Sequence, residues 1–131
     1  MRRGLPVVIV VGAIILIAVA ATAVAWPRPL PSSVAAVPGG SPARGADEIQ
    51  VAGCGACHTI PGIDGADSLV GPPLEHWSLR STIGGHTSNT PEHLIAWLRS
   101  PDDIDPGTDM PDLNLTERQA RDNAAYLFTL H

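Results

Sequence analysis

Two cysteines and a histidine, in Cys54-Gly-Ala-Cys57-His58, constrain this chain more than any other feature. They are its only cysteines, and the histidine directly follows the second one. This spacing is the attachment signal for c-type haem, in which two neighbouring thiols bond to the two vinyl groups of one porphyrin. His58 is then placed to supply an axial nitrogen to the iron. A small chain that carries such a group must fold around it, so the motif bears on fold and chemistry together.

Other sites built on a Cys-x-x-Cys pair fit this sequence less well. A structural zinc site needs four ligands and usually a second pair. A thioredoxin-like redox motif requires a βαβ context, and no strand pattern surrounds these residues. A disulfide within the pair would leave His58 without a role. We therefore predict one covalently attached haem c, with its iron, as the cofactor.

Residues 1–26 have the character of a membrane segment. Arg2 and Arg3 precede an uncharged apolar run from Leu5 to Trp26. About 20 apolar residues cross a bilayer as a helix, and the flanking positive charge favours a cytoplasmic N-terminus. Ala23-Val24-Ala25 also fits a signal-peptide cleavage site, which leaves cleavage open. We expect a single-pass protein of the bacterial cytoplasmic membrane, with its C-terminal part on the periplasmic or extracellular side.

The rest of the chain divides into a linker and one domain. Residues 27–44 are rich in proline, glycine and serine, which is typical of an extended tether. Residues 45–131 contain all thirteen acidic residues but only four of the eight arginines. This charge balance argues against a nucleic-acid partner, because phosphates require a basic patch. The segment is the expected haem domain.

Three helices are predicted within this domain, and no segment alternates well enough to predict a strand. The first covers about 46–53. The second follows a Thr90 cap, with Pro91 in its first turn, and ends at Pro101. The third runs from Thr116 to Leu130 and opens with a capping box.

The second axial ligand is predicted to be Met110. It lies in a proline-bounded loop before the last helix, and the other methionine is Met1. A methionine opposite a histidine raises the haem potential and fills both axial positions. Gly71-Pro72-Pro73-Leu74 could offer a carbonyl acceptor to the second nitrogen of His58, which would orient the ring. The competing ligands are the remaining histidines: His76, His86, His93 and His131.

These residues together resemble class I c-type cytochromes over nearly all of 46–131. The chain is most similar to the cytochrome c domain fused to subunit II of some bacterial haem–copper oxidases. It departs from that pattern because no second thiol pair exists to build a binuclear copper site. The matching stretches are Cys57-His58-Thr59-Ile60, Gly71-Pro72-Pro73-Leu74, Arg80-Ser81-Thr82-Ile83, Asn89-Thr90-Pro91-Glu92, Trp97-Leu98, Pro106-Gly107 leading to Met110-Pro111, and Ala125-Tyr126-Leu127.

The resemblance implies an all-α class I cytochrome c fold, in which three or more helices and long loops surround one covalent haem. It implies thioether links at Cys54 and Cys57 and axial ligation by His58 and Met110. The proximal wall would contain Pro72 and Leu74. The haem propionates would be contacted by Arg80 and Trp97.

Three functions follow as hypotheses. The leading one is a membrane-tethered electron carrier, not an enzyme. It would pass single electrons between respiratory proteins such as a quinol-oxidising complex and a terminal oxidase. The second is a fixed electron-transfer subunit of a larger oxidoreductase, such as an oxidase, a nitric oxide reductase or a sulfur-oxidising dehydrogenase. The third is an enzyme or gas sensor whose iron is open because Met110 does not bind it.

Overall fold

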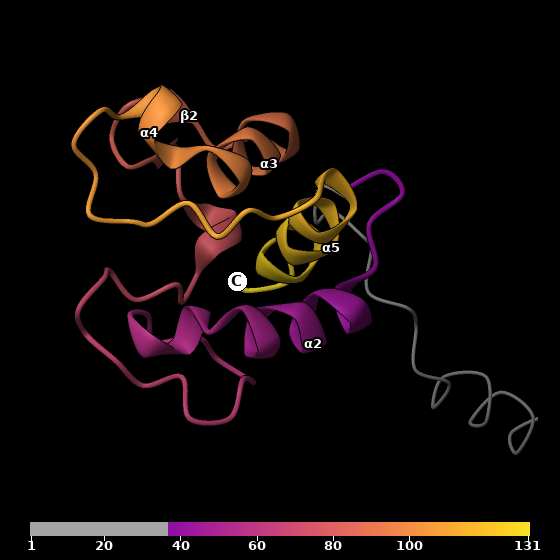
Figure 1. Cartoon of the computed structure of the whole chain (residues 1–131). Helices are drawn as coiled ribbons and strands as arrows, with labels where there is room; N and C mark the ends of the chain where they lie inside the picture. The colour runs from indigo at the N-terminus through magenta and orange to yellow at the C-terminus, as the bar shows by residue number, and fades with distance from the viewer. Residues whose placement is uncertain (1–36) are drawn as a thin grey trace, which may run out of the picture. The chain divides into compact units, whose positions relative to one another are not determined.

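The structure is a computed structural model that describes residues 37–131. In this part of the chain, helices and long loops are joined by one hairpin with two residues in each strand (Figure 1). The class I cytochrome c fold stays a prediction, as does the division of the chain into anchor, linker and domain. The elements are α2 (Pro42–Ala52), the 3-10 turns η1 (Cys54–Ala56) and η2 (Trp77–Leu79), β1 (Thr82–Ile83), β2 (Thr87–Ser88), α3 (Pro91–Arg99), α4 (Pro101–Ile104) and α5 (Glu117–Leu127).

Both N-terminal caps that the sequence predicts are confirmed. The Thr90 hydroxyl accepts a hydrogen bond from the His93 amide at 3.3 Å, and α3 begins at the next residue. At α5 the Thr116 hydroxyl accepts from the Gln119 amide, while the Gln119 side chain accepts from the Thr116 amide. These reciprocal bonds satisfy amide groups that the first turn of a helix leaves without partners.

The helix boundaries differ from the prediction in three places. The first helix begins at Pro42, inside the segment predicted as linker, because the Ser41 hydroxyl caps it by accepting from the Arg44 amide. The last helix ends at Leu127, three residues before the predicted end. Pro101 follows the end of α3 as predicted, but it also starts α4, because proline suits the first turn of a helix.

Helices α2 and α5 cross in direct contact, and α5 also packs against α3 (Figure 1). The crossing depends on Gly45, where a Cβ atom would overlap the backbone carbonyl of Asp122. On α5, Ala120 and Ala124 have no exposed surface, so small residues line both sides of the contact. The core that these helices share consists of Val37, Ile49, Ile60, Ala66, Leu74, Trp77, Ile83, Leu94, Ile95, Trp97, Leu98, Leu115, Ala120, Ala124, Ala125, Leu127 and Phe128.

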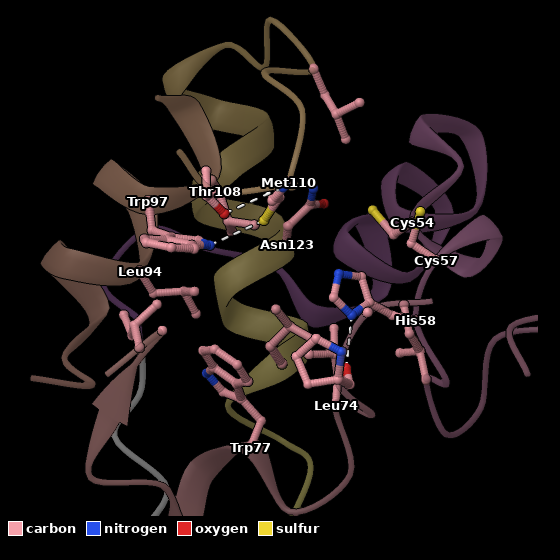
Figure 2. Close-up of a pocket in the computed structure, with 18 of the residues that line it drawn as sticks. Cys54, Cys57, His58, Leu74, Trp77, Leu94, Trp97, Thr108, Met110 and Asn123 are labelled. Atoms are coloured by element: carbon pink, nitrogen blue, oxygen red, sulfur yellow. Dashed lines mark hydrogen bonds between the residues drawn. The ribbon is translucent and has the colours of Figure 1, made fainter. Parts of the chain in front are cut away.

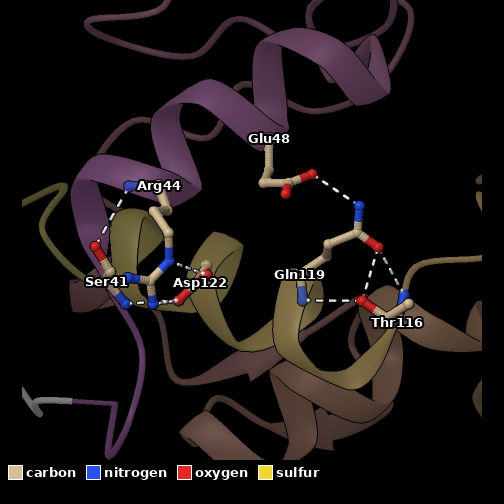
Figure 3. A network of polar contacts seen from close by, with 6 residues as sticks. All are labelled: Ser41, Arg44, Glu48, Thr116, Gln119 and Asp122. Carbon is tan, nitrogen blue, oxygen red and sulfur yellow. Dashed lines mark hydrogen bonds and ion pairs between the residues drawn. The ribbon is translucent and has the colours of Figure 1, made fainter.

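A buried carboxylate fixes the N-terminal end of this crossing (Figure 3). Asp122 of α5 is 1% exposed. It accepts hydrogen bonds from Arg44 Nε at 2.8 Å, from Arg44 Nη2 at 2.9 Å and from the Ser41 amide at 2.7 Å. The hydrogen bonds from Arg44 lower the pKa of the Asp122 carboxyl below its ordinary value. The contact ties the first turn of α2 to the middle of α5.

We expect the variant Asp122→Asn to be less stable than the wild type at pH 7, with a difference that shrinks in acid. A carboxyl group with a lowered folded-state pKa stabilises the fold above its unfolded-state pKa of about 4, and this stability is lost as the pH falls through the folded-state value. Urea unfolding of the full chain at pH 7 and at about pH 3 measures the effect. The exposed Asp64 supplies the control Asp64→Asn. Equal stability of the two variants at pH 7 would contradict the assignment.

Within residues 37–131, no helix is long and apolar enough to cross a bilayer. The predicted localisation as a single-pass protein of the bacterial cytoplasmic membrane is corrected by this finding. The segment on which that prediction depended, residues 1–26, lies outside the described residues. Many of the apolar residues within the described part of the chain form the core that α2, α3 and α5 share.

Candidate functional site

One cavity of about 400 Å³ collects every site residue that the sequence predicts. Its walls come from the end of α2, the loop after η1, helices α3 and α5, and the loop between α4 and α5 (Figure 2). This size and a mainly apolar lining are typical of sites for small molecules and cofactors. The eight predicted residues that line it are Cys54, Cys57, His58, Pro72, Leu74, Arg80, Trp97 and Met110.

The two thiols lie at the rim of this cavity, just after α2. Gly53 ends the helix in the left-handed conformation, with φ of 75°, which turns the chain into η1. The Cys57 and His58 amides then donate to the Cys54 carbonyl at 3.2 and 3.0 Å, so the motif is a compact turn. Both cysteines are free and half-buried, and burial raises the pKa of the Cys54 thiol. The turn presents both sulfur atoms on one side of the cavity (Figure 2).

The ring of His58 is oriented by the loop 71–74, as predicted from the proline-rich stretch. Its Nδ1 atom lies 2.8 Å from the Pro72 carbonyl oxygen. Since that oxygen can only accept, this hydrogen bond requires a proton on Nδ1, and a neutral ring then has its lone pair on Nε2. A Cβ atom at Gly71 would lie 2.6 Å from His58 Cε1, so only glycine fits beside the ring. The Gly71 amide also donates to the Cys57 carbonyl at 2.7 Å, which joins this loop to the thiol turn.

Met110 enters the same cavity from the loop between α4 and α5. Its amide donates to the Thr108 hydroxyl at 3.3 Å. Its sulfur accepts a hydrogen bond from Trp97 Nε1 at 3.1 Å (Figure 2). The methionine is therefore held both at its backbone and at its thioether. His58 and Met110 reach the cavity from different segments of the chain, and each presents an atom able to bind a metal.

The two residues that the sequence predicts as partners for acidic groups of a cofactor, Arg80 and Trp97, both have partners within the protein. The indole N–H of Trp97 is already donated to Met110. Arg80 donates to the carbonyl oxygens of Pro73 and Glu75, and its guanidinium lies 5.0 Å from the centre of the Trp77 ring. Trp77 also lines the cavity, and its indole N–H is buried without a hydrogen-bond partner. Trp77, rather than Trp97, is thus the indole with a free donor.

Sequence reasoning also missed Asn123. It lies on α5, lines the cavity, is 1% exposed, and neither end of its amide has a partner. A buried polar group without a hydrogen bond costs about 1–3 kcal/mol, so an unpartnered amide facing a cavity points to an occupant. The sequence contains one indication of this role: Asn123 is a polar residue within the apolar face that Ala120, Ala124 and Leu127 form on the last helix.

Among the described residues, His58 is the only histidine that lines the cavity. His93 is engaged through Nδ1 by the Thr87 and Ser88 hydroxyls, and His86 lies 3.4 Å from an Asp105 carboxylate oxygen. His76 and His131 are exposed. Across residues 37–131, no group of three or more histidine, cysteine, aspartate or glutamate side chains is placed to hold a metal ion. Met110 therefore has no histidine competitor within the cavity.

Comparison with known proteins gives one informative similarity. No protein-family model matches the chain. The "Cytochrome c oxidase subunit 2" of Alkalihalophilus pseudofirmus (strain ATCC BAA-2126 / JCM 17055 / OF4) is 28% identical over 88 residues, or 66% of this chain. The matched stretch covers 25% of that protein, so the chain spans about a quarter of the relative's length. The chain is thus distantly similar to part of an oxidase subunit, which suggests an electron-transfer context.

Proposed function

We propose that this chain is a monohaem c-type cytochrome of class I fold that carries single electrons and is not itself an enzyme. The observation that carries the proposal is the shared cavity. Two free thiols, an imidazole with a free Nε2 atom and a thioether, all predicted from sequence, line one space of about 400 Å³. The distant similarity to an oxidase subunit supports the same interpretation.

The residues present fit a covalent haem c. Cys54 and Cys57 are placed for thioether bonds, and the apolar walls suit the faces of a porphyrin. The unpartnered Trp77 N–H and the adjacent Arg80 suit its carboxylates, since both can donate to anionic oxygen. These two residues replace the pair Arg80 and Trp97 that the sequence suggested.

When bound, the haem iron gains or loses one electron, and the protein supplies position and electrostatics. His58 would bind from one side through Nε2, while the Pro72 carbonyl keeps the proton on Nδ1 and the ring in place. Met110 would bind from the other side. With both axial positions filled, no site is left for a substrate, which favours electron transfer over catalysis. Respiratory donor and acceptor proteins, such as a quinol-oxidising complex and a terminal oxidase, are the proposed partners.

The visible spectrum of the haem-loaded protein tests this proposal. We expect a low-spin spectrum with a far-red sulfur-to-iron band when oxidised, and no change on adding carbon monoxide when reduced. A leucine at position 110 removes the thioether, so the variant Met110→Leu should lose the far-red band and bind carbon monoxide. Prompt carbon monoxide binding by the wild type would overturn the electron-carrier proposal in favour of an enzyme or gas sensor.

A fixed subunit of a larger oxidoreductase is the second candidate, and the similarity to an oxidase subunit favours it. Such subunits include those of oxidases, nitric oxide reductases and sulfur-oxidising dehydrogenases. Purification under mild conditions separates the two candidates. A constant ratio to one partner enzyme would indicate a subunit, whereas recovery of the haem protein alone would indicate a diffusing carrier.

A further inference from the structure

Two buried polar side chains follow each other on α5, and only one of them has hydrogen-bond partners. Asp122 and Asn123 are each 1% exposed. The Asp122 carboxylate accepts hydrogen bonds from Ser41 and from Arg44. The Asn123 amide has no partner at its nitrogen or at its oxygen. Asn123 lines the cavity, and Figure 2 shows it among the side chains that surround this space.

The α5 face on which Asn123 lies is otherwise apolar. Ala120, Ala124 and Leu127 belong to this face and are buried. A leucine at position 123 would continue the face, and it would avoid the loss of stability that a buried amide without a partner causes. Groups that lower stability in this way are typical of positions where the activity of a protein requires them. The location of Asn123 therefore indicates a role within the cavity.

A covalent haem c in this cavity would supply no ordinary hydrogen-bond partner for the amide. The pyrrole nitrogens of the porphyrin bind the iron, and its vinyl groups are used by the two thioether bonds. Its carboxylates are already assigned to Trp77 and Arg80. The Asn123 amide therefore remains a dipole without a partner in the wall around the porphyrin. Such a dipole interacts strongly with a nearby charge, because little water screens it in the protein interior.

The charge of the haem changes with its oxidation state. Apart from the carboxylates, a porphyrin dianion with His58 and Met110 as neutral ligands is uncharged around ferrous iron and carries one positive charge around ferric iron. An amide with no hydrogen bond at either end can turn its carbonyl oxygen toward that charge. We propose that Asn123 stabilises the oxidised haem through its amide dipole and so lowers the reduction potential. The inference rests on the proposed haem function and adds a residue that tunes it.

The test compares the haem-loaded wild type with Asn123→Leu, which keeps the branched outline of the side chain but removes its dipole. We expect the ratio of oxidised to reduced protein at a fixed solution potential to fall about fivefold, the scale of one ordinary polar interaction. This corresponds to a rise in reduction potential of about 40 mV, at about 59 mV for each tenfold change. The urea midpoint of Asn123→Leu should be no lower than that of the wild type, because no polar group is left without a partner.

Leu127→Met is the matched control. It changes the packing of another buried cavity residue on α5 but introduces no amide. Its reduction potential should therefore equal that of the wild type. Both variants should keep the far-red sulfur-to-iron band, which shows that Met110 remains bound. A further measurement needs no variant: proton NMR of the reduced wild type should show a nuclear Overhauser contact between the Asn123 side-chain amide protons and protons of the porphyrin edge.

Two failures can be told apart. A wild type without covalent haem, or without the far-red band, would overturn the proposed function and with it this inference. In a wild type that has both, an unchanged potential in Asn123→Leu would overturn the inference alone. Equal shifts in Asn123→Leu and Leu127→Met would do the same, because packing and not the dipole would then be the cause. A lower urea midpoint of Asn123→Leu, or the absence of the Overhauser contact, would also overturn the inference alone.

Discussion

Replacing both Cys54 and Cys57 by alanine is expected to abolish the covalent haem attachment that we propose. The two thiols are free, lie in one turn and line the cavity, and no other cysteine occurs in the chain. Haem staining after denaturing electrophoresis measures the result, since only covalently held haem survives it. Each single variant should still stain, because one thioether remains. Staining of the double variant would contradict the assigned attachment sites, whereas an unstained wild type would contradict the proposed function.

The double variant should also lose its fold. Without haem, the mainly apolar walls of this cavity would face water instead of packing against a cofactor, and burial of apolar surface is worth about 25 cal/mol for each Å². A small domain is stable by only about 5–15 kcal/mol, so the loss of this burial is large on that scale. Circular dichroism should therefore show greatly reduced helix in the double variant, and each single variant should fall between it and the wild type. A fully helical double variant without haem would mean that the cavity collapses without the cofactor.

The second large effect is expected from Gly45→Ala in haem-loaded protein. Helix propensity alone would make this change stabilising by up to about 1 kcal/mol. The added methyl, however, would overlap the Asp122 carbonyl and force α2 away from α5. Overpacking of this kind costs about 1–3 kcal/mol or more, and backbone against backbone leaves little room to adjust. We expect a loss of at least about 3 kcal/mol, or a fall in Tm of about 12 °C or more.

Ala43→Gly is the matched control for this prediction. Ala43 lies on the exposed side of the same helix. The change should cost about 1 kcal/mol or less through propensity. Thermal unfolding of both variants separates the two causes, because propensity alone predicts opposite signs. A Gly45→Ala protein as stable as the wild type would show that α2 and α5 do not cross as closely as described.

Local signals in the sequence predicted the helices best. Thr90 with Pro91, and Thr116 with Gln119, are cap patterns that act within one turn, and both are present in the structure. The start of α2 was misplaced because Ser41 lies in a stretch whose composition is that of a linker. Its pairing with Asp122 joins residues 81 positions apart, and no local pattern reveals such a contact.

The site shows the same division between local and distant information. All eight predicted residues line one cavity. They could be predicted because motif spacing and a proline-bounded loop are local features of the sequence. The roles of the two tryptophans were not predictable, since they depend on which indole reaches Met110 in space. Asn123 could not be predicted as a site residue, because its importance depends on burial of its unpartnered amide. Burial is a property of the folded chain and not of the local sequence.

The contact between α2 and α5 also imposes an order on biosynthesis. Glu48 and Gln119, whose side chains are 2.8 Å apart across that contact, are separated by 71 residues. The ribosome therefore releases α2 and the adjacent thiols long before it makes α5. During this interval the apolar face of α2 has no partner, and the thiols remain open. Under the proposed function, the two thiols would therefore be open to a porphyrin until α5 packs against α2.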